Sequence, residues 1–177
     1  MSDPRTGPGP RDATAIAGDA TPTGEPLPWS EAERRLADAQ TYWFATTAPG
    51  GGPHVRPVLG VWLDGTLHTT SGPGARKARN LEVDGDCAFS LSADSVDMVL
   101  EGSASRVLDP AQLERVAEAY GAKYGWPARV AGDAFDAPYG APTAGPPPYQ
   151  VYAVRPRAVY AFGTDEELAP RSTRWRF

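Results

Sequence analysis

Basic residues gather directly after a glycine-rich stretch near the middle of the sequence. The run G-P-G at 72–74 interrupts the chain, and the helical segment that follows carries Arg76, Lys77 and Arg79 within four positions. The first turn of a helix has unpaired N–H groups and a partial positive charge, so it attracts anions. The pattern predicts a phosphate site, because arginine binds phosphate through two N–H groups at once. A solvated basic helix end has the same residues, and the spacing matches neither a P-loop nor a dinucleotide-binding glycine motif.

A further basic side chain lies one strand earlier. Residues 55–63 read as a single strand whose odd-numbered positions are apolar and face the core, while Arg56 and Trp62 lie on the opposite face. The D-G pair at 64–65 predicts a two-residue hairpin turn, because a type I′ turn needs positive φ at both central positions. The β-branched run at 66–71 is then the next strand. We expect Arg56 to converge on the same spot as the basic helix.

The remaining candidates for chemistry are few. His54 and His68 are the only imidazoles, which argues against a histidine-rich metal site, and the single cysteine excludes an internal disulfide and a cysteine-based zinc cluster. His68 lies mid-strand beside the phosphate loop, where it either binds a ligand or is an ordinary strand histidine. Alternation sends His68 and Ser71 to opposite faces, which disfavours a Ser-His-Asp triad. A phosphate pocket without evident catalytic side chains suggests that a cofactor carries the chemistry.

Length and charge narrow the class of protein. The chain has 177 residues, enough for one domain with a real core, and a formal net charge of -5 from 22 acidic and 17 basic residues. An acidic surplus argues against a nucleic-acid partner. No run reaches the roughly 18 apolar residues of a membrane helix, and no secretory signal is visible. The sequence therefore predicts a cytoplasmic protein with no membrane partner.

The outer parts of the chain carry less chemistry. Residues 1–28 are rich in Gly, Pro, Thr, Asp and Ala and predict a disordered tail. A helix is expected from Trp29, with Ser30 and Glu33 forming a capping box. The closing T-R-W-R-F at 173–177 is expected to dock on the body of the protein or on a partner subunit.

Short strands and one further helix fill the rest. Strands are expected at 41–47, 87–92, 96–108 and 149–162, and the longest helix begins at the cap Asp109. The segment 126–148 is long and irregular, and its aromatic residues either shape a substrate pocket or pin the loop to the body. With about six strands and three helices, the pattern fits a mostly β (α+β) protein, a small antiparallel barrel with flanking helices over residues 29–177.

From about Tyr42 to Phe162 the chain resembles the pyridoxamine 5′-phosphate oxidase-like, flavin-binding split-barrel superfamily. The strand with Arg56, the turn L-D-G-T-L-H-T-T-S, the run G-A-R-K-A-R-N-L and the later strand V-L-E-G-S-A carry the resemblance, and G-A-R-K-A is the most specific. The resemblance implies a six-stranded antiparallel split β-barrel. It also implies cofactor contacts: phosphate contacts from Arg56, Arg76 and Lys77, and contacts to the flavin ring from His68, Thr69, Thr70 and Ser71.

The resemblance also implies an FMN-dependent oxidoreductase, with hydride transfer at the flavin and a homodimer that binds two cofactors between its subunits. The spelling K-x-x-N-L, with Asn80, is common in branches that use the deazaflavin coenzyme F-420, so that cofactor is the alternative. The C-terminal segment with which the true vitamin B6 oxidases grip their substrate is not found, although the ending Arg174-Trp175-Arg176 resembles other members. A non-catalytic flavin or ligand carrier and an anion-binding structural dimer remain open.

Overall fold

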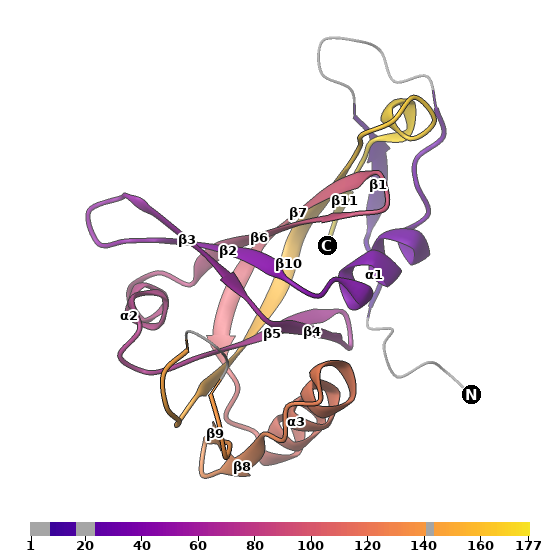
Figure 1. The fold of residues 1–177 in the computed structure, drawn as a ribbon. Coiled ribbons are helices and arrows are strands. Elements are labelled where there is room, and N and C mark those ends of the chain that lie inside the picture. Colours follow the sequence, from indigo (N-terminus) through magenta and orange to yellow (C-terminus); the bar gives the residue numbers. More distant parts are fainter. Residues whose placement is uncertain (1–7, 17–23, 141–143) are drawn as a thin grey trace.

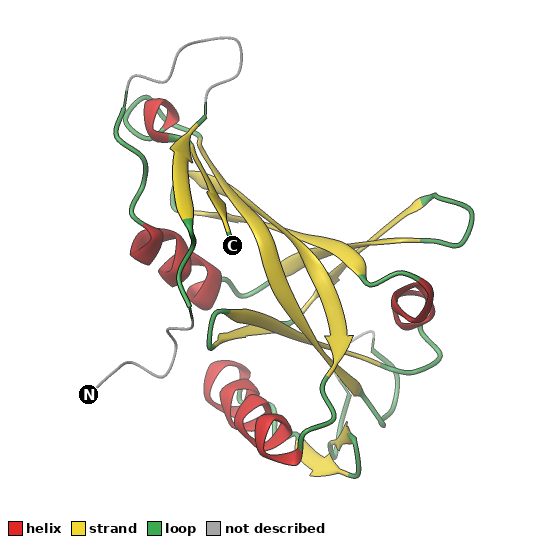
Figure 2. Ribbon diagram, turned by 180° about the vertical axis from the view of Figure 1, so that it is seen from behind, coloured by secondary structure: helices red, strands yellow, loops and turns green. Residues whose placement is uncertain are grey.

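A computed structural model of the chain describes residues 8–16, 24–140 and 144–177. Within these ranges the fold is α+β: one nine-stranded antiparallel sheet, a separate two-stranded hairpin, three α-helices and a short 3-10 helix (Figures 1 and 2). The helices are α1 (Trp29–Asp38), α2 (Arg76–Val83) and α3 (Pro110–Tyr124). The strands are β1 (Asp12–Ala15), β2 (Tyr42–Thr47), β3 (Pro53–Val58), β4 (Gly60–Leu63), β5 (Thr66–Ser71), β6 (Asp86–Ala93), β7 (Val96–Arg106), β8 (Arg129–Ala131), β9 (Ala134–Asp136), β10 (Gln150–Gly163) and β11 (Thr173–Arg176).

The large sheet curls into a barrel that does not close. Its order is β1-β11-β10-β7-β6-β2-β3, and β5, which carries β4, pairs with the first half of β10. A register shift between Pro156 and Ala158 bends β10, so its second half pairs with β11 instead. The bend lies beside Gly102, where an added Cβ would lie 2.3 Å from the carbonyl oxygen of Arg155. Glycine at position 102 thus permits this close approach of two backbones. The predicted split-barrel fold class is confirmed.

The segment read as one strand at 55–63 forms two strands instead. β3 pairs with β2 and β4 pairs with β5, and the chain crosses the open seam of the barrel at Leu59. The predicted face of the first part is also reversed: Val55 is 42% exposed, whereas Arg56 is opposite the buried Phe44 and shares its face. Trp62, expected on the outer side, is buried. β3 has apolar residues on both sides, so its own sequence does not decide which side is buried. The pairing with β2, in which buried and exposed residues alternate, decides it.

The hairpin turn between β4 and β5 is as expected. Asp64 has φ 52° and Gly65 has φ 71°, the positive values that a type I′ turn needs. The predicted cap of α3 is also confirmed, because the Asp109 carboxylate accepts a hydrogen bond from the Gln112 backbone N–H (2.8 Å). The capping box at α1 is not formed, since Pro28 is its N-cap and no side chain caps it.

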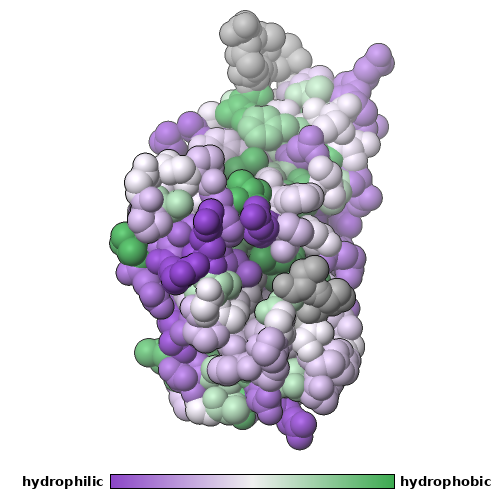
Figure 3. All heavy atoms as spheres, turned by 60° about the vertical axis from the view of Figure 1, so that its left-hand side comes forward, coloured by the Kyte–Doolittle hydropathy of each residue, from purple (hydrophilic) through white to green (hydrophobic). Residues whose placement is uncertain are grey.

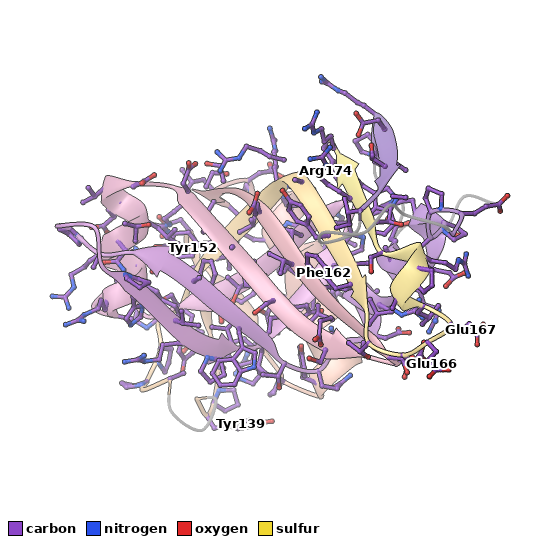
Figure 4. The ribbon with its side chains drawn as sticks, turned by 90° about the horizontal axis from the view of Figure 1, so that it is seen from above. Tyr139, Tyr152, Phe162, Glu166, Glu167 and Arg174 are labelled. Carbon is purple, nitrogen blue, oxygen red and sulfur yellow. The ribbon has the colours of Figure 1, made fainter. Side chains whose placement is uncertain are left out.

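Two apolar cores flank the sheet. One fills the barrel and extends under α1, and the other lies between α3 and the sheet portion formed by β4, β5 and the start of β10. Trp126 and Phe135 belong to the second core, so these two aromatic residues pin the 126–148 segment to the body. Tyr139 is 56% exposed and projects from the edge of the molecule in Figure 4. The segment is also less irregular than expected, because β8 and β9 form a hairpin in it.

The described parts of the first 28 residues differ from the predicted disordered tail. Residues 12–15 form β1, which pairs with β11 along its whole length, and Leu27 is only 2% exposed. The composition argument failed because β1 is held by backbone hydrogen bonds while its side chains stay mostly exposed. The predicted docking of 173–177 on the protein's own body is confirmed, since Trp175 is fully buried and packs edge-on against Trp29. No α-helix in the described ranges is long and apolar enough to cross a membrane.

Candidate functional site

The start of α2 has the open N–H groups that an anion site requires. Ala75 is the N-cap residue, and its methyl side chain supplies no capping hydrogen bond. The turn before it is closed by a hydrogen bond from the Ala75 N–H to the Gly72 carbonyl oxygen (3.0 Å). The next backbone N–H groups, those of Arg76 and Lys77, therefore face the approach to the helix with no side-chain partner of their own.

Three cations from two elements converge at this point. His54 on β3 is buried, and its pKa is lowered first by burial and then by the nearby charges of Arg56, Arg76 and Lys77. Burial also lowers the pKa of Lys77, and the Arg56 guanidinium lowers it further. The charges of Arg56, Arg76 and Lys77 therefore all lie near His54, and Arg56 on β3 lies near Lys77 on α2.

The cluster has no acidic counterpart in the ranges 8–16, 24–140 and 144–177: the ion pairs found there involve other arginines. Figure 3, which looks onto the side that carries α2 and the β2–β3 hairpin, shows strongly hydrophilic residues gathered in the middle of this face. Close cations without counterions repel one another, and an anion with several acceptor oxygens relieves that repulsion. The geometry thus suits a phosphate group.

The four predicted ring contacts on β5 divide between two faces. Thr69 and Ser71 share the face of Leu67, which lines the barrel interior. The Thr69 hydroxyl donates to the carbonyl oxygen of Leu59 (2.9 Å) and the Ser71 hydroxyl to that of Gly72 (3.2 Å). These two residues lie on the same side of the sheet as the basic cluster.

His68 and Thr70 point to the other side of β5. His68 is 1% exposed, and its Nε2 lies 3.2 Å from the side-chain nitrogen of Gln112 on α3. Burial lowers the pKa of His68 to about 4, so the ring is neutral at physiological pH and accepts this hydrogen bond. The structure therefore places His68 against α3, on the face of β5 opposite to Thr69 and Ser71.

Asn80, the last predicted member, is also buried. Its side-chain NH₂ donates to the hydroxyl of Thr46 on β2 (2.8 Å), which ties α2 to the barrel. This bond fixes the helix whose first turn carries Arg76 and Lys77. Asn80 thus helps to position Arg76 and Lys77 through its hydrogen bond to β2.

Sequence reasoning missed His54 as a member of the cluster. The signal was available, because His54 and Arg56 are two residues apart on one strand and must share a face. It also did not predict that Tyr152, a residue labelled in Figure 4, lies opposite Thr69 on the interior face of β10. That pairing joins residues about 80 positions apart, and no local spacing indicates it.

Comparison with known proteins identifies the family of the chain. The structure first defines the class, an open antiparallel split barrel with a basic cluster at a helix start. Residues 29–163 match the family described as pyridoxamine 5′-phosphate oxidase, and the chain belongs to that family. No curated protein matches the sequence.

Solved structures of similar fold share little sequence with the chain. A conserved hypothetical protein from Mycobacterium tuberculosis is 19% identical with a TM-score of 0.60, over 80% of this chain and 91% of that one. A FAD-binding protein from Mesorhizobium loti is 15% identical (TM-score 0.57; 85% and 95% covered), and an F-420 reductase is 21% identical (TM-score 0.51; 78% and 98% covered). At these identities the similarity establishes the fold alone.

Proposed function

We propose that the chain is an oxidoreductase that holds a flavin-type cofactor by its phosphate at the basic cluster of β3 and α2. The observation that carries this proposal is the convergence of Arg56, Arg76 and Lys77 beside an uncapped helix start. Family membership supports the proposal, as do the names of two structural relatives, a FAD-binding protein and an F-420 reductase.

FMN is the first choice of cofactor and F-420 the alternative. FMN ends in a phosphate monoester with close to two negative charges, whereas the phosphate of F-420 is a diester with one. Three cations and two open backbone N–H groups match the more highly charged group better. A bound flavin or deazaflavin supplies hydride transfer to or from a small molecule, and the chain's residues bind it, orient it and balance its charge.

Removing two of the cations should abolish cofactor binding without unfolding the protein. We expect the double substitution Arg76→Ala and Lys77→Ala to weaken FMN at least about 100-fold, because each deletes a charge-assisted contact. Arg76 is exposed and Lys77 is half-buried outside both apolar cores, so circular dichroism should be unchanged. Fluorescence titration with FMN and with F-420 gives the two affinities.

The matched control is Arg79→Ala, which removes an exposed arginine one turn further along the same helix. Its FMN affinity should stay close to that of the unmodified protein. Equal loss in both variants would mean a general charge effect, and unchanged affinity in the double variant would sink the assignment. Tighter binding of F-420 than of FMN would establish the alternative cofactor, and absence of turnover with any reduced cofactor would favour a carrier.

We also propose that the chain forms a homodimer through the outer face of its sheet. Trp43 is 52% exposed there, and the neighbouring Val55 and the more distant Phe162 are 42% and 41% exposed. The register aligns Trp43, Ser90 and Val99 in one row across β2, β6 and β7. An uncovered sheet face with a large exposed aromatic residue is typical of a protein interface.

Replacing Trp43 with glutamate should weaken the dimer at least about tenfold, because a buried charge replaces a central aromatic contact. Sedimentation equilibrium measures this dissociation constant. Leu108→Glu is the control, since Leu108 is 59% exposed but lies two residues after β7, outside the row. A monomeric unmodified protein would refute the proposed dimer.

A further inference from the structure

A cleft lies along the free edge of β4 and is lined by residues of α1, β4 and α3. Both helices flank this edge of β4 in the ribbon (Figures 1 and 2). Its volume is about 270 Å³, just below the usual range for ligand sites and suited to a small molecule. Alanines of both helices and residues 61–63 of β4 form its walls, and Asp38 and Lys123 are its charged residues. The cleft shares no residue with the basic cluster at α2.

The backbone of β4 offers the cleft one free peptide donor and one free acceptor. The two-residue turn makes Leu63 and Thr66 a hydrogen-bonded pair, so the N–H and C=O of Trp62 point away from β5. The peptide groups of Gly60, two residues earlier, also point away from β5. The Gly60 N–H donates to the Tyr124 hydroxyl, and the Gly60 carbonyl oxygen accepts hydrogen bonds from Lys123 and Tyr124 of α3. Among the described residues no partner holds the corresponding groups of Trp62.

Lys123 brings a positive charge to one end of the cleft. Its ammonium donates to the Tyr42 hydroxyl (2.9 Å) and to the Gly60 carbonyl oxygen (3.0 Å), and lies near the rings of Tyr42 and Tyr124. The third N–H has no acceptor within the described ranges. Burial lowers the pKa of Lys123 to about 8 while the charge of Asp38 opposes that shift, so the ammonium stays mostly protonated at pH 7.

Asp38 supplies a negative charge from the opposite side. It ends α1 and lies 3.7 Å from Arg34, an exposed pair of little strength. Asp38 and Lys123 make no ion pair with each other. The cleft therefore has a cation from α3, an anion from α1, and a peptide donor and acceptor from β4, over apolar walls.

We propose that this cleft binds a small apolar α-amino acid, with its carboxylate on Lys123 and the N–H of Trp62 and its ammonium group on Asp38 and the carbonyl of Trp62. A zwitterion satisfies both charges and both peptide groups at once. A phosphate monoester is a poor match, because the cleft offers one cation instead of three. Its apolar walls favour a hydrocarbon side chain over a polar one.

The test is calorimetric titration of the full chain at pH 7 with L-leucine as the probe. Isocaproate, which lacks only the ammonium group, and isoamylamine, which lacks only the carboxylate, are the paired comparison ligands. We expect leucine to bind with a dissociation constant of about 1 mM or tighter, and each comparison ligand to bind at least about tenfold more weakly.

Three variants locate the binding. Lys123→Met keeps the aliphatic stem and removes the charge, Asp38→Asn removes the opposite charge, and Ala122→Leu fills the cleft without touching either. Each should weaken leucine at least about tenfold. Glu118→Gln, an exposed change on the same helix, should leave the affinity unchanged. If Lys123→Met does not fold, the other two variants still decide the matter.

Absence of leucine binding at about 10 mM would overturn the proposal. So would an affinity that survives Asp38→Asn and Ala122→Leu, because the ligand would then sit elsewhere. Isocaproate binding as tightly as leucine would also overturn it, since the site would then recognise a simple carboxylate. The proposal does not rest on the flavin assignment, and the variant without Arg76 and Lys77 should bind leucine normally.

Discussion

Replacing Trp175 with alanine is expected to lower the free energy of unfolding by about 3–5 kcal/mol, the usual cost of deleting a large buried aromatic side chain. Trp175 is fully buried although it lies near the end of the chain, and it pairs with Val159 on one side and Ala13 on the other. Its ring packs against Trp29, which also contacts Trp62 and Phe177. The substitution thus opens a cavity where β11, α1 and the barrel meet.

Guanidinium unfolding at fixed protein concentration measures this loss, since a dimer would make stability depend on concentration. The melting temperature should fall by on the order of 10 °C for a chain of this size. Trp175→Phe is the matched control, because it keeps an aromatic ring and removes an indole N–H that has no partner among the described residues. It should lose much less stability than the alanine variant, and an equal loss in both would show that the packing account is wrong.

The second large effect is a loss of stability in mild acid that depends on His68. Burial holds the pKa of His68 at about 4 in the folded protein, below the value near 6.5 of an unfolded chain. The unfolded state therefore binds more protons between these values, and stability falls as the pH drops from 6.5 toward 4. From pH 7 to pH 5 this histidine alone should cost about 2 kcal/mol.

His68→Gln should remove that part of the pH dependence while keeping an acceptor for Gln112. The measurement compares the free energies of unfolding at pH 7 and pH 5 for the two proteins, so the titration of carboxylates cancels in the difference. His54 has a lowered pKa as well, and His54→Gln shows how much of the slope belongs to the other imidazole. Identical slopes in the His68 variant and the unmodified protein would contradict a neutral buried ring.

Local signals in the sequence predicted the features that depend on a few neighbouring residues. The D-G turn, the cap at Asp109 and the basic start of α2 follow from turn geometry, capping and charge, and the structure has all three. Composition and periodicity alone predicted only a small barrel with flanking helices. The family resemblance added that the barrel is split. The expectation that Arg56 lies near the start of α2 also rested on local sequence, because only one tight hairpin separates β3 from α2.

Features that depend on distant pairing were not predictable in this way. The face of β3 is set by its pairing with β2, so alternation placed Val55 inside when it lies outside. The strand β1 exists because β11 offers it an edge about 160 residues later. The resemblance assigned His68 to the flavin ring, and no local spacing indicates that Gln112 of α3 lies within hydrogen-bond distance of it.

Lys77 and Lys123 are the two lysines of the sequence, and each stands at one of the two proposed sites. The other basic side chains are arginines, which common amine reagents do not modify. Acylating labels and amine cross-linkers will therefore report on these two positions and the chain's amino terminus, and a ligand that shields one of them changes one signal alone. Because one of the two lysines lies at each proposed site, coupling the protein to a support through its amines would block the sites at which binding is to be measured.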